Sequence, residues 1–450
     1  MPSARCAYPF VGLLLVLITS PASGQLPAFG SYDDPREQRN RFWWEREQVL
    51  DLMGGFSLIG AQWRTAAGLT FTLDTPVLTA RLSGTLRAGI YGTYRPDLDE
   101  PYDLLRLLEY ARYRPTPAAR LYARLGPLQR LRLGTGHLVD FLATDTAWDE
   151  RTVGIEARWW SPALDVAAFT GDVRFDGLIG GRVGMHPLVW TSAPRTRSLY
   201  LGLSYVTDRA PSVAGLRRLE AFALDASLDV MHAGAFTLTP FASYARYLGF
   251  GEGLQFGARL FSDNFIDLGR LHARLTFFLN GTGFIPGYVN AFYPVNNLHA
   301  RILRADDPPP NEDADPFAGI RLDQSAGGDA LMSEVRLLLF SGFEFYYAFR
   351  RHYGSQALST LHLRLYLRAR RFSFYLGQDR GGLRGFLTLF NDLGDLSALD
   401  FQTDYRFAGD FRVYVRARYT YERLEDGPDG TARFLVQRRF EPFVGLRTTF

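Results

Sequence analysis

The stretch Phe411-Arg-Val-Tyr-Val-Arg-Ala-Arg-Tyr-Thr-Tyr-Glu422 alternates strictly between two kinds of side chain. Its odd positions carry apolar or aromatic residues, and its even positions carry polar or charged residues or tyrosine. An unbroken period of two predicts a β-strand with one apolar face, because a helix would scatter the charges around its circumference. Strands in soluble proteins usually have about 5 or 6 residues, whereas a tilted strand that crosses a membrane needs about 9 to 11. The length of this stretch therefore favours a membrane strand.

The same alternation recurs along the chain. In 361–370 four leucines and an alanine occupy the odd positions, and His362, Arg364, Tyr366, Arg368 and Arg370 occupy the even ones. Shorter stretches with the same pattern lie at 153–160, 198–205, 270–277 and 343–350, whereas the faces of 217–247 are ambiguous. One face of the predicted sheet is rich in Leu, Phe, Val and Tyr, and the other is rich in Arg.

Composition narrows the class of protein. The chain has 450 residues, of which 47% are hydrophobic and 22% charged, so intrinsic disorder is not expected. A mean hydropathy of -0.10, with no apolar run of about 18 residues, excludes a polytopic helical membrane protein. All 50 basic residues are arginines, and 47 acidic residues bring the net charge to +3. Because no strong basic excess exists, nucleic acid is not an expected partner.

The first 24 residues have the pattern of a secretory signal peptide. Arg5 is their only charge, the apolar run Phe10 to Thr19 is too short to span a bilayer as a helix, and Ala22-Ser23-Gly24 supplies a cleavage site. The single cysteine, Cys6, would leave with this segment. The expected mature chain therefore has no disulfide, no thiol nucleophile and no zinc–thiolate site, a combination typical of bacterial envelope proteins.

The chain ends Phe443-Val444-Gly445-Leu446-Arg447-Thr448-Thr449-Phe450. This ending resembles the β-signal of bacterial outer-membrane proteins, with Gly445 and the terminal Phe450 as its key residues and Thr448 as a departure from the usual pattern. The resemblance covers about eight residues and identifies no particular family within the porin-like superfamily. It implies an outer-membrane location and recognition by the barrel-assembly machinery.

Connection lengths indicate how such strands are joined. Tight turns are expected at Gly126-Pro127, 160–163, 341–342 and 408–410, and longer loops at 97–116, 137–150 and 424–431. Long loops on one side and short turns on the other are typical of outer-membrane barrels. We therefore expect an all-β, transmembrane, antiparallel up-and-down β-barrel in residues 55–450, with about 18–20 strands and 16 as a lower alternative. Outer-membrane lipid and lipopolysaccharide would surround it.

Parity assigns the arginines to the interior of this barrel. A basic side chain facing lipid near the bilayer midplane costs about 2–4 kcal/mol, so the charged face of each strand must line the lumen. The acidic residues on that face are expected to pair with the cations. The predicted lumen residues are Arg120, Arg124, Arg130, Arg132, Arg270, His272, Arg274, Arg364, Arg368, Arg412, Arg416, Arg418, Glu156, Glu334, Glu344, Asp400 and Asp404. Trp159, Trp160 and Trp190 fall beside predicted turns, where an aromatic girdle would lie.

Two segments are candidates for occupying so wide a lumen. Residues 25–54 form an N-terminal segment with a helix predicted from Asp34-Pro35 to about Leu52, either a lumen plug or gate or a periplasmic tail helix. Residues 301–328 form a long loop with an acidic cluster at 306–315, which would be a constriction loop, a calcium-binding loop without EF-hand spacing, or a solvated surface loop.

The sequence carries no recognisable catalytic motif. Neither Gly-x-Ser-x-Gly nor His-Glu-x-x-His occurs, and a grouping of His137 with Asp140 and Ser161 has no support from spacing. We expect no metal, no cofactor and no enzymatic activity. The expected function is a porin-like channel for small hydrophilic or anionic solutes. The alternatives are a plugged surface barrel for polysaccharide assembly, anchoring or adhesion, and a barrel hydrolase. Uptake of lipids or hydrophobic compounds would require an apolar stripe in the lumen, which the strand pattern does not contain.

Overall fold

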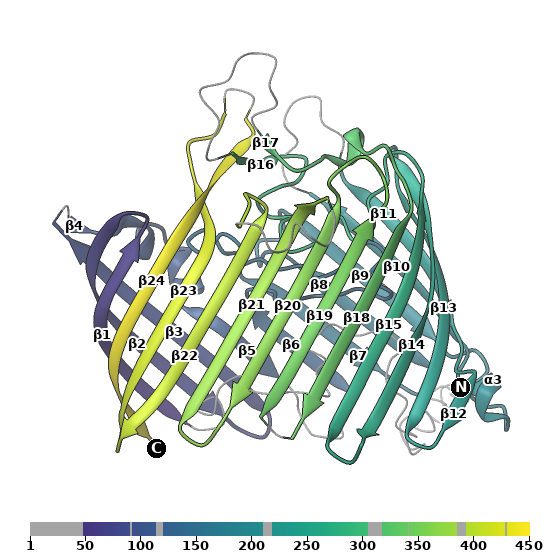
Figure 1. The fold of residues 1–450 in the computed structure, drawn as a ribbon, viewed down its shortest axis with the longest axis horizontal. Helices are drawn as coiled ribbons and strands as arrows, with labels where there is room; N and C mark the ends of the chain where they lie inside the picture. Colours follow the sequence, from purple (N-terminus) through teal and green to yellow (C-terminus); the bar gives the residue numbers. More distant parts are fainter. Residues whose placement is uncertain are drawn as a thin grey trace, which may run out of the picture.

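The computed structural model describes residues 48–90, 92–113, 120–209, 218–304, 317–340, 342–384, 393–427 and 430–450. Its main feature is a closed barrel of twenty antiparallel strands, in which β1 pairs with both β2 and β24 (Figure 1). This confirms the predicted fold class at the upper end of the expected strand number. The twenty strands are β1 (Val49–Ile59), β2 (Gln62–Asp74), β3 (Leu78–Gly89), β5 (Leu108–Tyr113), β6 (Leu121–Gly126), β7 (Gly154–Trp160), β8 (Leu164–Thr170), β9 (Leu178–Met185), β10 (Tyr200–Asp208), β11 (Glu220–Ser227), β13 (Phe236–Tyr247), β14 (Gly251–Phe265), β15 (Gly269–Asn280), β18 (Ala330–Leu339), β19 (Phe343–His352), β20 (Ser359–Arg368), β21 (Phe372–Leu383), β22 (Ser397–Ala408), β23 (Phe411–Arg423) and β24 (Ala432–Thr449).

Short strands and helices accompany the barrel. The strands β4 (Gly92–Thr93), β12 (Met231–Ala233), β16 (Ala300–Leu303) and β17 (Phe317–Ala318) extend turns and rims, and β16 runs parallel to the upper end of β24. The helices are η3 (Arg95–Asp97), α2 (Asp103–Arg106), α3 (Pro194–Arg197) and η4 (Leu322–Gln324). No helix in the described part of the chain is long and apolar enough to cross a membrane.

Alternation along each strand separates an apolar outside from a polar inside. On β23, Phe411 and Val413 are exposed on the outer face, whereas Arg412 and Tyr414 are buried inside. Exposed leucines such as Leu203 on β10 continue this outer surface around the barrel. The pleat places successive side chains on opposite faces, so the period of two in the sequence becomes two chemically different surfaces.

The two ends of the barrel differ as expected. Most turns at the end that carries the C-terminus are short, for example 75–77, 161–163, 266–268 and 409–410 (Figure 1). The connections 90–107, 127–153 and 281–329 at the opposite end are long. Three predicted details are wrong. The loop expected at 97–116 ends earlier, because residues 108–113 form β5. Gly126-Pro127 begins the long connection between β6 and β7 instead of forming a tight turn, and that connection starts well before residue 137.

The first strand begins earlier than predicted. Val49 to Leu52, the end of the predicted helix, belong to β1, because Asp51 and Met53 face inward while Leu50 and Leu52 face outward. This strand closes the barrel against β24, so its ladder hydrogen bonds outweigh helical propensity. The rest of the predicted helix and the signal peptide lie outside the described residues.

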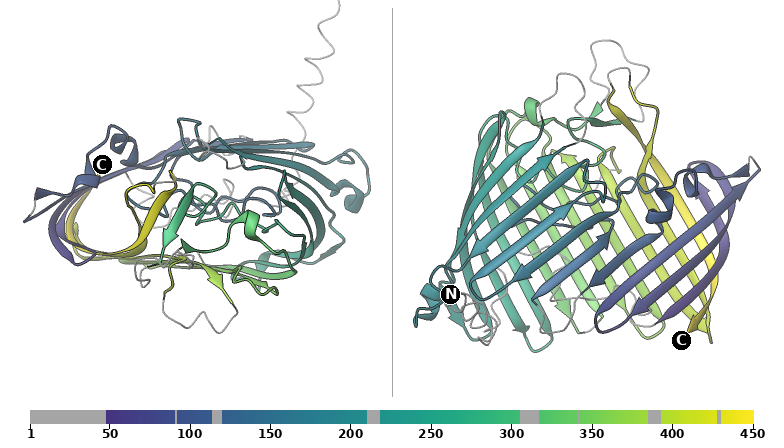
Figure 2. Two further views of the ribbon diagram at one scale, coloured as in Figure 1. Left: turned by 90° about the horizontal axis from the view of Figure 1, so that it is seen from above. Right: turned by 180° about the vertical axis from the view of Figure 1, so that it is seen from behind.

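Two long connections fold into the barrel. The first inward segment, residues 127–153, joins β6 to β7, and the second inward segment, residues 281–299, follows β15; both run through the interior in the view from above (Figure 2). They meet at an isolated parallel bridge between Val139 and Val289. A buried apolar cluster contains side chains of both segments and of the wall, including Leu138, Leu142, Phe284 and Tyr288. The barrel thus has a hydrophobic core of its own.

The second inward segment lies just before the loop that the sequence singled out. Described parts of that loop form β16, β17 and η4, and β16 and β17 lie at the rim near the upper end of β24 (Figure 1). The acidic cluster at 306–315 lies outside the described residues. The inward residues 281–299 escaped the prediction because they are mainly apolar and aromatic, as a core requires.

Candidate functional site

The predicted lumen residues lie on the inside of the barrel to different depths. The structure buries Arg124, Arg130, Arg132, Arg274, Arg364, Arg412, Arg418, Glu156, Glu334 and Asp404. It leaves Arg120, Arg270, His272, Arg368, Arg416, Glu344 and Asp400 partly buried. Arg130 and Arg132 are not on a strand, as parity had assumed, but on the first inward segment. Their charges therefore lie on the segment that fills the lumen, not on the wall.

A group of five charged side chains joins the first inward segment to the wall. This central cluster consists of Arg132 and Asp140 on the segment, Arg274 on β15, Glu334 on β18 and Arg350 on β19. Arg132 donates to Asp140 Oδ1 at 2.7 Å and to Glu334 Oε1 at 2.8 Å. Arg350 donates to Asp140 Oδ2 at 2.6 Å, and Arg274 lies 3.7 Å from Glu334 Oε2. Three guanidinium groups thus share two carboxylates.

The same arginines also hold the backbone of both inward segments. Arg274 donates to the carbonyl oxygen of Thr135, and Arg350 donates to that of Pro286, each at 2.5 Å. Between the segments, the amide of Asp140 donates to the carbonyl of Val289 at 3.0 Å. A buried backbone group without a partner is costly, so these bonds fix where each segment can lie.

A second ionic group spans the place where the barrel closes. Asp51 on β1 accepts from Arg447 on β24 at 2.6 Å and lies 2.9 Å from Arg412 on β23. Arg412 also pairs with Asp404 on β22. Four consecutive strands are linked in this way, which ties the first strand of the barrel to the last three.

The acid pairings expected from the sequence are confirmed in part. Glu334 and Asp404 pair with predicted arginines, and Asp400 pairs with Arg416 at 2.8 Å. Glu156 and Glu344 pair with arginines that the prediction did not include, Arg158 at 2.8 Å and Arg336 at 3.0 Å.

The sequence analysis missed further interior residues, because they lie outside the stretches in which polar and apolar residues clearly alternate. Asp140 is in a loop, Asp51 was assigned to the predicted helix, and Asp379 on β21 carries two bonds, to His362 and Arg364, both at 2.7 Å. Phe141 stacks on the His362 ring at a centroid distance of 4.1 Å. The predicted strands carry more arginines than acidic residues on their inner face. This imbalance indicated that acidic side chains from other segments would also pair with these arginines.

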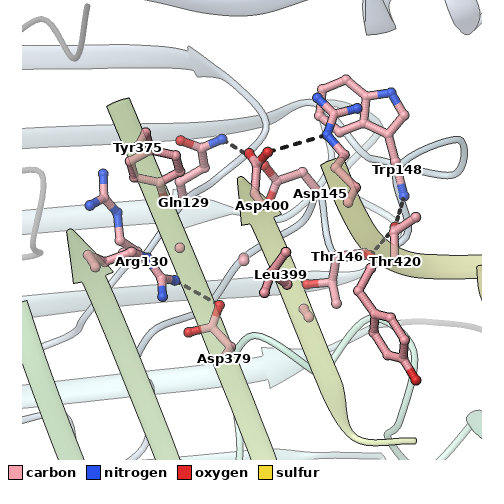
Figure 3. A pocket seen from close by; sticks show the side chains of 16 residues that line it. Gln129, Arg130, Asp145, Thr146, Trp148, Tyr375, Asp379, Leu399, Asp400 and Thr420 are labelled. Atoms are coloured by element: carbon pink, nitrogen blue, oxygen red, sulfur yellow. Dashed lines mark hydrogen bonds and ion pairs between the residues drawn. The ribbon is translucent and has the colours of Figure 1, made fainter. Parts of the chain in front are cut away.

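Two cavities lie in this interior. The smaller, of about 70 Å³, is surrounded by residues of the first inward segment and of β20 to β23, among them Gln129, Trp148 and Asp400 (Figure 3). The larger, of about 550 Å³, lies between β1 to β3, β23, β24 and the chain around residues 96–109. Seven arginines and five acidic residues line it, so cations are in excess there as well.

The structure does not assemble the catalytic grouping considered from the sequence. His137 Nδ1 lies 3.1 Å from Ser243 Oγ on β13, and Asp140 is held by two arginines. Ser161 lies in the β7–β8 turn, where its hydroxyl bonds the backbone of Leu164. Within the described ranges, no group of three His, Cys, Asp or Glu side chains could hold a metal ion.

Barrel and exterior together define the class of protein. A closed antiparallel barrel leaves no strand edge unpaired, and an apolar outer surface around a charged interior suits it to a lipid bilayer. The chain is a transmembrane β-barrel protein of the bacterial outer membrane, with a porin-like fold.

Comparison with known proteins adds no narrower assignment. No family model matches the sequence, and no curated protein does. Among solved structures, it is similar to Wzi of Escherichia coli, described as a carbohydrate-binding β-barrel involved in group 1 capsule assembly, with 12% identity, 90% of this chain and 85% of that chain covered, and a TM-score of 0.33. OpdL of Pseudomonas aeruginosa and OccAB3 of Acinetobacter baumannii each match at 10% identity over 89% of this chain and 98% of theirs, with a TM-score of 0.33. These resemblances assign no function to the chain.

Proposed function

We propose that the protein is a porin-like channel for small anionic solutes whose lumen is narrowed by its two inward segments. The observation that carries the proposal is the central cluster, in which three arginines face two carboxylates where the first segment meets the wall. Fixed positive charge in a confined, poorly hydrated passage raises the local concentration of anions and excludes cations.

The size of the passage follows from the packing of the inward segments. Their shared apolar cluster and backbone bonds replace much of the water that an empty barrel of twenty strands would contain. Passage is then selective and slow, in contrast to general diffusion. The proposal contains no catalytic step.

Planar bilayer recordings test this function. We expect the wild-type protein to show a small single-channel conductance and, in a KCl gradient, a reversal potential with the sign of anion selectivity. Replacing residues 129–151 by a short Gly-Ser linker should raise the conductance several-fold, because it removes the first inward segment. The control replaces the rim loop 424–431 by the same linker and should leave conductance unchanged. A large, unselective wild-type conductance would contradict the proposal.

A second candidate is the plugged surface barrel for polysaccharide assembly, anchoring or adhesion. The hydrophobic cluster that joins the two inward segments favours it, since a dry core is an effective seal. This candidate is supported if the wild-type protein shows no conductance and only the variant with residues 129–151 replaced conducts.

The expected partners accompany either function. Outer-membrane lipid and lipopolysaccharide would surround the apolar exterior, and the assembly machinery would recognise the last strand. Phe450 is exposed at the end of β24 and stacks on Phe71 at a centroid distance of 5.8 Å, so its ring is accessible at the barrel edge.

A further inference from the structure

The barrel wall is interrupted between β3 and β5. These strands pair only over Leu78–Leu82 of β3, and the upper half of β3 pairs on this side with the two-residue strand β4 alone. Residues 94–107, which include η3 and α2, fill the interval (Figure 2). Two further backbone bonds join β3 to this interval: the amide of Ser83 donates to the carbonyl of Leu107 at 2.7 Å, and the amide of Tyr94 donates to the carbonyl of Arg87 at 2.8 Å. We call residues 83–89 together with 94–107 the seam.

The seam has an apolar outer side and a charged inner side. Leu98 and Leu104 are 55% and 65% exposed. Asp103 and Arg106 on α2 are buried and pair with each other at 2.6 Å, and Arg87 on β3 pairs with Asp97. Exposed leucine side chains therefore lie on the outer side of the wall where the strand ladder is missing.

The larger cavity lies behind the seam and borders both sides of it. Its lining includes the outward residues Leu86, Leu98 and Leu104, and also the interior residues Arg87, Arg151 and Arg418. A volume of about 550 Å³ is within the range of small-molecule sites, roughly 300–1,000 Å³. Exposed leucines and buried arginines thus line the same space.

Among the arginines that line this cavity, two guanidinium groups have unused donors. Arg418 is 6% exposed, its Nε lies 3.6 Å from Asp400 Oδ1, and its buried Nη2 has no hydrogen-bond partner among the described residues. Arg151 donates to the carbonyl oxygens of Trp148 and Arg106, and its buried Nε lacks a partner within the same residues. Both groups lie against the Trp148 ring, at 3.3 and 4.2 Å from its centroid. Unmet buried donors are costly, and an anionic group would satisfy them.

We propose that the seam cavity binds an acidic single-chain amphiphile, a carboxylate or phosphate head group on an aliphatic chain. The head group lies against Arg418 and Arg151, and the chain extends past Leu86, Leu98 and Leu104 toward the membrane. The site needs no conduction through the lumen, so it stands apart from the proposed channel. Leu98 and Leu104 lie outside the strand ladder, where a period of two carries no information, so the alternation could not reveal this apolar surface.

Trp148 provides the readout, because a bromine atom quenches tryptophan fluorescence on contact. The full-length protein in phosphatidylcholine vesicles is titrated with 2-bromododecanoate, and the component that Trp148→Phe removes is followed. We expect this component to be quenched saturably. Arg418→Gln should weaken the apparent affinity about tenfold, the usual scale for losing a charge-assisted hydrogen bond. Leu104→Gln should weaken it as well.

Matched variants and ligands keep the test decisive. Arg246→Gln and Leu203→Gln, at exposed positions remote from the seam, should leave the quenching unchanged. The uncharged 2-bromododecanol should quench this component far less. Absence of Trp148-dependent quenching, equal quenching by the alcohol, or displacement by inorganic phosphate at the same concentration would each overturn the proposal. If Arg418→Gln does not fold, Leu104→Gln still tests the site.

Discussion

The two halves of the barrel wall are built differently. From β13 to β24 the ring strands have 10 to 18 residues, whereas β5 to β9 have only 6 to 8. A tilted strand needs about 9 to 11 residues to cross a membrane, so each ring strand from β13 to β24 is long enough to cross it without help from other segments. Near the short strands β5 to β9, residues 94–107 fill the gap in the wall between β3 and β5, and the first inward segment packs inside the wall. Both proposed sites include chain that leaves the ladder, the first inward segment and residues 94–107.

Leaving the ladder requires particular backbone conformations. Gly126 ends β6 with φ of +136°, and a Cβ there would lie 2.8 Å from the carbonyl oxygen of Glu109. Only glycine fits such a turn. Within the segment, Phe141 has φ of 61° and keeps this unfavourable conformation because its ring packs on His362 and Tyr346. Tertiary contacts thus determine the path of the inward segment.

The largest predicted effect comes from breaking the central cluster. Asp140→Ala removes the carboxylate that pairs with the buried Arg350 and leaves the three guanidinium groups of the cluster with one carboxylate, Glu334, which should cost about 3–5 kcal/mol of unfolding free energy. The same change should free the first inward segment and raise single-channel conductance. Denaturant unfolding of the protein in lipid vesicles, followed by tryptophan fluorescence, measures the stability.

The matched control is Glu252→Ala, which removes an exposed partner 3.8 Å from Arg246. Surface ion pairs contribute about 0–1 kcal/mol, so little change is expected. Equal losses in the two variants would mean that the cluster does not hold the segment in place.

A smaller effect compares the outer surfaces of the two halves. Leu275→Arg places a cation on the lipid face of β15 and should cost about 2–4 kcal/mol near the midplane. Leu104→Arg changes α2, within the connection 90–107 at the long-loop end, where the cost falls to about 0–1 kcal/mol. Unfolding free energies of both variants are compared in the same vesicles. If Leu104→Arg lowered the unfolding free energy more than Leu275→Arg does, Leu104 would lie nearer the bilayer midplane than Leu275.

This contrast also explains what the sequence could predict. Strict alternation in 361–370 and 411–422 identified strands, faces and the barrel, because one local rule governs each residue there. Asp140, Arg350 and Pro286 meet through contacts between residues more than sixty positions apart, which no local pattern encodes. Arg132 was expected on a wall strand, but it is buried on the first inward segment. The sequence did not predict the seam either, because α2 has only four residues and is too short to show a periodic pattern.

The smallest predicted effect is a pH dependence that arises in the first inward segment. His137 is 1% exposed, and burial, with the nearby charges of Arg350 and Arg274, lowers its pKa to about 3. In the unfolded chain the pKa of histidine is about 6.5, so below that pH the unfolded state binds a proton that the folded state refuses. Stability should therefore fall as pH drops from about 6.5 toward 3, by about 2 kcal/mol at pH 5, since each pKa unit is about 1.4 kcal/mol. His137→Gln should reduce this fall by about that amount, whereas His232→Gln, on the exposed strand β12, should leave it unchanged. Unfolding curves of the three proteins at pH 7 and pH 5 measure the difference, and an undiminished fall in His137→Gln would show that the acid sensitivity arises elsewhere in the barrel.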